Sequence, residues 1–185
     1  NFAYGGNGSA VYVYGFNTTI KTNEFFNHTS SRGTVYIFGN ESVIQNSTFE
    51  HNAASSGGGA IYIYGNYALI DACYFNDNNA TIHGGAIHTH GDHAMIVNSK
   101  FYYNNAVPHP EDIEQGLGGA VFIRGNNNEI SKSIYDGNTP RNGSAIYNRG
   151  EDLHINDDDF LENQAFSYLL ITTATPQSSY YNGSN

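Results

Sequence analysis

The chain has 185 residues, of which 13% are charged, and its 17 acidic and 7 basic side chains give a formal net charge of -10. An acidic chain repels phosphate backbones and anionic lipid, so we exclude nucleic acid as a partner. No apolar run approaches the length of a membrane span, so we expect no membrane insertion of this segment. The high Gly and Tyr content and the absence of Trp are typical of strands and turns rather than of a helical bundle.

A block of the form G-[GS]-A-[IV]-Y-[IV]-x-G recurs along almost the whole chain and predicts a short strand in each copy. Alternate residues of a strand share a face, so the branched aliphatic positions of the block should point inward and its aromatic positions outward. The second copy is degenerate at its start. The copies lie at residues 8–15, 32–39, 58–65, 84–91, 118–125 and 143–150.

A second block, I-x-x-[small polar]-x-[FY]-x-x-[NH], follows every copy of the first at the same offset. Length varies only in the stretch after it, which we therefore expect to be a loop. Its isoleucines are Ile20, Ile44, Ile70, Ile96, Ile130 and Ile155, and its small residues are Asn23, Ser47, Cys73, Ser99, Ser133 and Asp158. Its aromatics are Phe25, Phe49, Phe75, Phe101, Tyr135 and Phe160, and its last residues are His28, Asn52, Asn78, Asn104, Asn138 and Asn163.

A repeat of about 25 residues with two short strands, and with Gly and Asn at the breaks, predicts one coil of a parallel β-solenoid. The spacing between the two blocks does not fit a six-residue period, so we favour an all-β, right-handed, single-stranded parallel β-helix of about six coils. We take residues 1–185 as one domain, with repeats over 8–163 and a C-terminal extension or partial further coil over 164–185. Equivalent side chains should stack in ladders, with Cys73 as a small buried residue and the Asn column lining a turn.

The outward positions of the first block are rich in aromatic residues. If they face water, they form a stripe of stacked rings suited to sugar rings or to a partner surface. The alternative is that the rings only stabilise the sheet or lie under a terminal segment. One column holds Tyr12, Tyr36, Tyr62, His88, Phe122 and Tyr147, and the next holds Tyr14, Phe38, Tyr64, His90, Arg124 and Arg149.

Two other groups were weighed as reactive sites. His88 and His90 stand two apart on one strand face, a spacing that presents two imidazoles to a transition metal. They replace Tyr in the outward columns, however, so exposed stacked histidines are the default, and we expect no metal and no other cofactor. Residues 157–159 are three consecutive aspartates, but alternating residues do not converge as paired catalytic acids must, so we expect no enzyme.

Loops and turns offer two further features. The connection between Asn104 and Gly118 is longer than its equivalents and should protrude, as a recognition loop or as a tolerated insertion. Asn-x-Ser/Thr sequons recur at predicted turns and are candidate glycosylation sites in an exported protein. They begin at Asn7, Asn17, Asn27, Asn40, Asn46, Asn79, Asn142 and Asn182.

The paired motifs, GGA followed by Ile or Val and then FxxN, resemble those of chlamydial polymorphic outer-membrane proteins and of adhesin-like proteins from methanogenic archaea. The resemblance covers about residues 8–163. Its matching pieces include Gly59-Ala60-Ile61, Gly85-Ala86-Ile87 and Gly119-Ala120-Val121, with 49–52, 75–78 and 101–104 as FxxN. The resemblance implies a secreted or surface-displayed right-handed β-helix used in attachment, and it supplies no catalytic residues.

We therefore expect a non-catalytic, adhesin-like protein, extracellular or on the cell surface, that binds a cell-surface glycan or protein. End-to-end self-association of the coils is a further expectation, because the ends of a β-helix present strand edges. The first alternative is a structural subunit of an extracellular filament. The second is a carbohydrate-active β-helix enzyme, a lyase or glycosidase.

Overall fold

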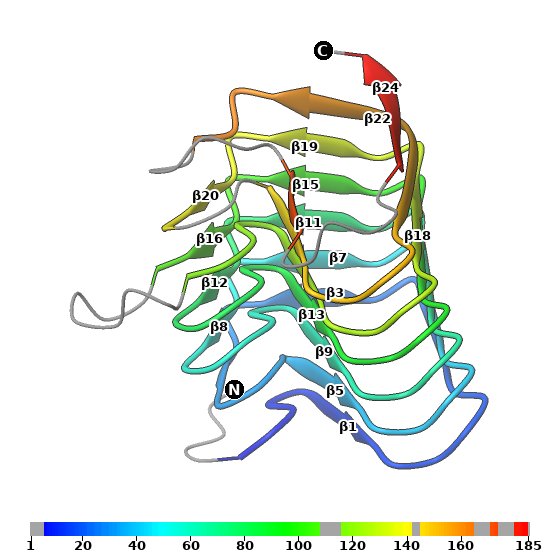
Figure 1. Cartoon of the computed structure of the whole chain (residues 1–185). Helices are drawn as coiled ribbons and strands as arrows, with labels where there is room; N and C mark the ends of the chain where they lie inside the picture. Colours follow the sequence, from blue (N-terminus) through cyan, green and yellow to red (C-terminus); the bar gives the residue numbers. More distant parts are fainter. Residues whose placement is uncertain (1–5, 108–115, 142–144, 165–170, 174–179, 185) are drawn as a thin grey trace.

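The computed structural model describes residues 6–107, 116–141, 145–164, 171–173 and 180–184, and its strands form three parallel sheets (Figure 1). The six copies of the first block supply six strands of the first sheet, the C-terminal extension supplies the seventh, and the strands pair in sequence order. They are β1 (Val11–Val13), β5 (Val35–Ile37), β9 (Ile61–Ile63), β13 (Ile87–Thr89), β17 (Val121–Ile123), β21 (Ile146–Asn148) and β23 (Ile171–Thr173).

The second block supplies the second sheet, which has two arms. One arm holds β2 (Thr19–Lys21), β6 (Val43–Gln45), β10 (Leu69–Asp71), β14 (Met95–Val97) and β18 (Glu129–Ser131). The other holds β3 (Glu24–Phe26), β7 (Thr48–Glu50), β11 (Tyr74–Asn76), β15 (Lys100–Tyr102) and β19 (Ile134–Asp136). The long strand β22 (His154–Leu161) joins the arms, and β24 (Tyr180–Ser184) pairs with it.

The third sheet consists of two-residue strands directly after the Asn column. These are β4 (Thr29–Ser30), β8 (Ala53–Ala54), β12 (Asn79–Ala80), β16 (Asn105–Ala106) and β20 (Thr139–Pro140). The stretch that we expected to be a loop therefore begins with a strand, which is too short to show any periodicity in the sequence. Residues 108–115, within the long connection, lie outside the described residues.

Consecutive coils lie in register, since equivalent residues of the repeats pair directly: Phe75 pairs with Phe49 and with Phe101. Five full turns separate β1 from β21, and β23 and β24 continue the stack in the C-terminal extension. The predicted parallel β-helix is thus confirmed. Stacking identical strands pairs every backbone group with the coils on both sides, which is why so small a repeat needs no disulfide.

The interior is built from the ladders expected from the two blocks. All six isoleucines and all six aromatics of the second block are buried. Adjacent rings of the aromatic ladder lie nearly parallel, with centroids 4.7 Å apart for Phe25 and Phe49 and 5.1 Å apart for Phe49 and Phe75. Because each ring packs between two others, the ladder extends through every coil of the core.

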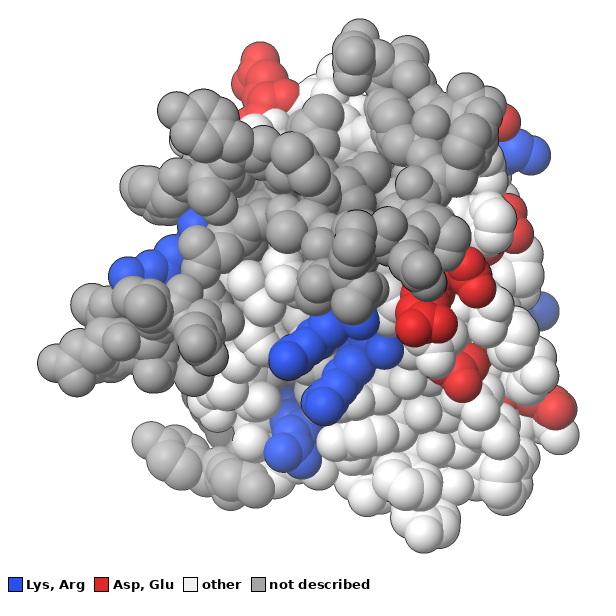
Figure 2. Space-filling model, viewed as in Figure 1, with Lys and Arg blue, Asp and Glu red and all other residues white. Residues whose placement is uncertain are grey.

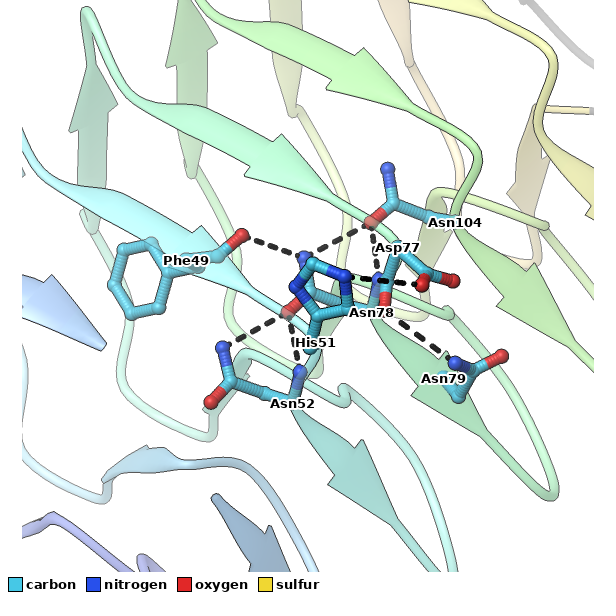
Figure 3. A network of polar contacts seen from close by, with 7 residues as sticks. All are labelled: Phe49, His51, Asn52, Asp77, Asn78, Asn79 and Asn104. Atoms are coloured by element: carbon cyan, nitrogen blue, oxygen red, sulfur yellow. Dashed lines mark hydrogen bonds and ion pairs between the residues drawn. The ribbon is translucent and has the colours of Figure 1, made fainter. Parts of the chain in front are cut away.

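The Asn column forms a polar ladder inside the corner between the second and third sheets (Figure 3). Asn78 is fully buried, and its Nδ2 donates to the backbone oxygen of Phe49 at 2.9 Å and to Oδ1 of Asn104 at 3.0 Å. Its Oδ1 accepts from the backbone N and the Nδ2 of Asn52. One amide thus joins three coils, and the expectation that this column bonds turn backbone is confirmed.

In five of the six coils, three corner residues other than glycine adopt a left-handed conformation, and in the remaining coil Gly137 takes the third corner. In the third repeat these are Tyr67, Ala72 and Asp77, with φ of 57°, 51° and 50°. Asn and Asp tolerate this region, but Tyr and Ala disfavour it by about 1 kcal/mol or more. The repeated hydrogen-bond ladders therefore hold these corners in place, and residue type alone does not reveal them.

Truncating the centre of the aromatic ladder tests the core. We expect Phe75→Ala to lower the free energy of unfolding by about 3 to 5 kcal/mol, because it leaves a cavity between two stacked rings. The matched control is Phe26→Ala, whose ring is 56% exposed on β3, and it should change stability by less than about 0.5 kcal/mol. Urea denaturation measures both, and an equal effect of the two changes would contradict the register.

The polar ladder is tested by Asn78→Ala, which leaves the amide of Asn52 and the carbonyl of Phe49 buried without their partners. We expect a loss of about 3 to 5 kcal/mol, since each unsatisfied buried group costs about 1 to 3 kcal/mol. The neighbouring exposed Asn79 donates one long bond to Asp77 O at 3.4 Å. Asn79→Ala should therefore be nearly neutral in the same denaturation assay, and a similar loss in both variants would refute a special role for the ladder.

Candidate functional site

The outward side chains of the first sheet stand in two rows that differ in exposure. We call one the inner row, which holds Tyr12, Tyr36, Tyr62, His88, Phe122 and Tyr147, and the other the outer row, which holds Tyr14, Phe38, Tyr64, His90, Arg124 and Arg149. The inner row is buried at its four central positions. The outer row is exposed at Tyr14, Phe38, Arg124 and Arg149, and half-buried at Tyr64 and His90.

The inner row is covered by the turns that precede the strands of the first sheet. These turns stack through bridges that join Asn7 to Arg32, Gly57 to His83, and His83 to Leu117. The His83 ring lies 4.4 Å from the Phe122 ring, and the Arg32 guanidinium lies over the Tyr62 ring at 5.8 Å. The expectation that both columns face water is therefore wrong for Tyr36, Tyr62, His88 and Phe122.

Sequence reasoning missed this cover because it aligned Arg32 with Gly8, the first residue of the block. In the structure Arg32 pairs with Asn7, and Gly33 takes the left-handed conformation that Gly8 has in the first copy. The second copy is thus one residue shorter before its strand. In the third repeat, a Cβ on Gly57 would lie 2.3 Å from Nδ1 of His88, so this turn packs directly against the inner row. The equivalent residues of the other copies differ in type, so no repeated signal marks the turn in the sequence.

The outer row forms one continuous stack of rings along its first four positions. Ring centroids are 5.0 Å apart between Tyr14 and Phe38, 5.7 Å between Phe38 and Tyr64, and 4.5 Å between Tyr64 and His90. The Tyr62 hydroxyl forms a 2.8 Å hydrogen bond with Nε2 of His90 and so ties the outer row to the inner one. The result is a continuous row of rings, tilted by 41° between Phe38 and Tyr64, that is held by the sheet below it.

Three histidines, His90 of the outer row and the neighbouring His83 and His88, are held neutral. Burial, with a smaller contribution from nearby arginines, lowers the pKa of His83 and of His90 to about 4. His88 is fully enclosed, so burial lowers its pKa as well, and neither of its ring nitrogens has a partner among the described residues. None of the three therefore carries a charge at neutral pH.

The geometry does not favour a metal on His88 and His90. Their rings stack 4.8 Å apart with an interplanar angle of 7°, so their nitrogen lone pairs run parallel rather than toward one point. Nε2 of His90 already bonds to Tyr62. Within the described ranges no group of three or more His, Cys, Asp or Glu side chains is arranged to hold a metal ion.

Arginines supply the positive charge of this face. Arg32, Arg124 and Arg149 all act on the histidines, which places the three around the same cluster. Figure 2 shows basic side chains gathered over the first sheet, with acidic side chains to the right of the group. In the described part of the chain none of these arginines forms an ion pair with a carboxylate. An acidic protein thus presents a local basic surface.

The three consecutive aspartates do not form a paired acid site. Asp158 points into the core, where its Oδ1 accepts a 2.7 Å hydrogen bond from the backbone N of Ser133. Asp157 and Asp159 are exposed. Burial raises the pKa of Asp158 to about 7, because its Oδ2 is buried without a partner among the described residues.

Cys73, in the same small column, packs as an inert buried residue. Its Sγ lies 3.3 Å from the backbone oxygen of Asp71, and burial raises its pKa to about 11. A thiol with so high a pKa is a poor nucleophile.

The sequons divide by exposure. Asn17, Asn27, Asn46 and Asn79 are exposed, and the first three occupy left-handed corners. Asn7 and Asn40 are partly buried, and Oδ1 of Asn40 accepts a bond from the backbone N of Asn66. Asn142 and the side chain of Asn182 lie outside the described residues.

The stacked coils, the internal ladders and the corners together define a parallel β-helix. A protein-family model described as a right-handed β-helix region matches residues 5–182. The chain therefore belongs to the right-handed β-helix family, which gives the coil its hand. Comparisons with curated proteins and with solved structures found no match. No helix with the length and apolar character of a membrane span occurs in the described part of the chain.

The buried carboxyl of Asp158 predicts a pH dependence of stability. Its folded pKa of about 7 lies above its ordinary value of 3.8, so the folded state holds a proton that the unfolded chain releases. Stability from this group is therefore full below about pH 4 and falls as the pH rises toward 7. We expect Asp158→Asn to raise the free energy of unfolding by roughly 1 to 3 kcal/mol at pH 8, with little change at pH 4.

Asn fits this site, because Asn23 occupies the equivalent position of the first coil and its Nδ2 donates to Lys21 O at 2.7 Å. Urea denaturation across the pH range measures the effect. Glu24→Gln, an exposed carboxylate on β3, is the control and should leave the pH profile unchanged. A variant profile that runs parallel to that of the wild type would show that Asp158 ionises normally.

Proposed function

We propose that this chain is a non-catalytic, adhesin-like module, displayed outside the cell or on its surface, that mediates attachment through the outer row of the first sheet. The observation that carries the proposal is the row of rings formed by Tyr14, Phe38, Tyr64 and His90, which is exposed at its first two positions and half-buried at the next two. Because these rings pack against one another, the row presents ring edges and polar tips at strand spacing, which suit successive units of a glycan or a flat partner surface. Of these two kinds of partner, we favour the glycan.

The rigidity of the row supports this role. Every outer-row residue except Tyr14 follows a three-residue strand that pairs with strands on both sides, and the residues themselves are bonded to the preceding coil, as in Tyr64 N to Ile37 O at 2.8 Å and His90 N to Ile63 O at 2.8 Å. Little conformational entropy is lost when such a surface binds. Each contact is weak, so attachment depends on several contacts made together.

Two features support a displayed module over the alternatives. The divergent directions of Asp157, Asp158 and Asp159 argue against the paired acids of a carbohydrate-active enzyme. At the C-terminal end, β23 and β24 of the chain itself pair with β21 and β22, which argues against a filament joined through the edges of those two strands. The exposed sequons lie at corners and in the third sheet, so glycans on them would leave the outer row free.

Removing two adjacent rings of the outer row tests the proposal. We expect Phe38→Ser combined with Tyr64→Ser to abolish binding in a cell-attachment assay and on a glycan array, because the continuous stack is broken at its centre. Tyr62 is left intact, since it is buried and bonded to His90.

The matched control is Tyr74→Ser combined with Tyr102→Ser, a tilted, half-buried pair of rings with centroids 5.6 Å apart on the second sheet. It should bind like the wild type. Circular dichroism and thermal melting establish that both variants keep the fold. Attachment that survives the loss of Phe38 and Tyr64 would reject the outer row as the binding surface.

A further inference from the structure

The outer row changes in residue type along the rod. Aromatic rings follow β1, β5, β9 and β13, and arginines follow β17 and β21. Arg124 and Arg149 are exposed and stand in register on adjacent coils, because Ile123 and Asn148, which precede them, pair directly. Their backbone positions are thus about one strand spacing, roughly 4.8 Å, apart. Two like charges on adjacent coils repel each other, and an anion bound between them offsets that repulsion.

Among the described residues, no ion pair compensates this charge. Arg32 adds a third cation beside the cluster, where it acts on His88 and His90. The three histidines are neutral at pH 7, and within the described residues no carboxylate pairs with any of these arginines. The chain has a net charge of -10, so this local group of cations, unpaired with any described carboxylate, favours an anionic ligand at this one place.

We propose that the ligand of the outer row is an acidic linear glycan, whose sugar units pack against the open ring edges of Phe38, Tyr64 and His90 and whose carboxylate or sulfate groups bind Arg124 and Arg149. This inference rests on the proposed function and names its ligand class. Rings and cations lie in a single row on consecutive strands, so one extended chain contacts both. Guanidinium groups bind carboxylate and sulfate oxygens through two parallel hydrogen bonds.

The charge on the protein side is arginine alone, which makes the binding sensitive to salt. Exposed charges are screened within about 8 Å at physiological ionic strength and more strongly above it. The rest of the acidic chain repels a polyanion, so screening weakens the attraction at the row while it also relieves repulsion elsewhere. A loss of binding with added salt therefore reports on the arginine pair.

Three dextrans with a common backbone provide the probes: unmodified, carboxymethylated and sulfated. In biolayer interferometry with the full chain, we expect binding to one or both charged dextrans and much weaker binding to unmodified dextran. Arg124→Gln combined with Arg149→Gln should weaken charged-dextran binding by about tenfold or more, since each charge-assisted contact contributes over 1 kcal/mol. The charged dextran that binds more tightly identifies the anionic group.

Lys21→Gln combined with Lys132→Gln is the matched control, because it removes the same charge from exposed positions of the second sheet. It should bind within about twofold of the wild type, since screened charges far from the ligand contribute little. Poly-glutamate is the second control, and it should bind weakly because it offers no sugar units to the ring edges. Thermal melting should show both double variants to be folded.

Equal binding of all three dextrans, equal losses in the Arg and Lys variants, or poly-glutamate binding as tight as that of the charged dextrans would overturn the inference. In each of these cases the proposed function stands if attachment is still lost when Phe38 and Tyr64 are replaced. If attachment is unaffected both by the replacement of Phe38 and Tyr64 and by the replacement of Arg124 and Arg149, the proposed function is overturned, and the inference with it.

Discussion

The structure depends on one constraint: every side chain of a coil lies one strand spacing from its equivalent in the next coil. This spacing is about 4.8 Å, close enough for rings, amides and branched side chains to be in direct contact. A residue type is therefore favoured at an interior position when it packs well against an identical residue in the next coil. Phenylalanine, isoleucine and asparagine each do so in this chain, the first by stacking, the second by aliphatic contact and the third by a chain of amide hydrogen bonds.

The same constraint penalises charge. A ladder of aspartates or lysines would place like charges side by side, and burial would increase the repulsion between them. Asparagine supplies the acceptor of a carboxylate without its charge, which is why it fills the corner ladder at Asn52, Asn78 and Asn104. Asp158 is tolerated because its equivalent in the preceding coil is Ser133, an uncharged donor. Only 13% of the residues are charged, in keeping with this penalty.

Much of the fold could be predicted because ladders repeat the same residue type at a constant spacing. The interior Ile and Phe columns, the Asn column and the division of the first block into inward and outward positions all follow from that repetition. The features that were missed lack such a signal. The cover over the inner row comes from a turn whose residues differ in each copy, namely Asn7, Arg32, Gly57, His83 and Leu117.

The left-handed corners could be predicted only in part, for a similar reason. A left-handed conformation is expected at Asn46 or Asn98, but not at Ala72 or Lys132, which occupy the same corner of other coils. At these positions the inter-coil hydrogen bonds, such as Ala72 N to Val97 O at 3.2 Å, override the preference of the residue. Local propensity is thus a weak guide wherever a neighbouring copy determines the backbone.

The constraint also indicates where function can develop. Interior positions must match their neighbours, so a change in one coil disturbs two others, whereas an exposed row tolerates a different residue in each coil. The outer row is such a place, since it runs from Tyr and Phe through His to Arg, while the Ile column beneath the neighbouring sheet does not vary. An exposed position can change its residue type from one coil to the next without disturbing the core. Such a change can therefore contribute to ligand binding rather than to folding. In this chain that change is the transition from rings to arginines between His90 and Arg124.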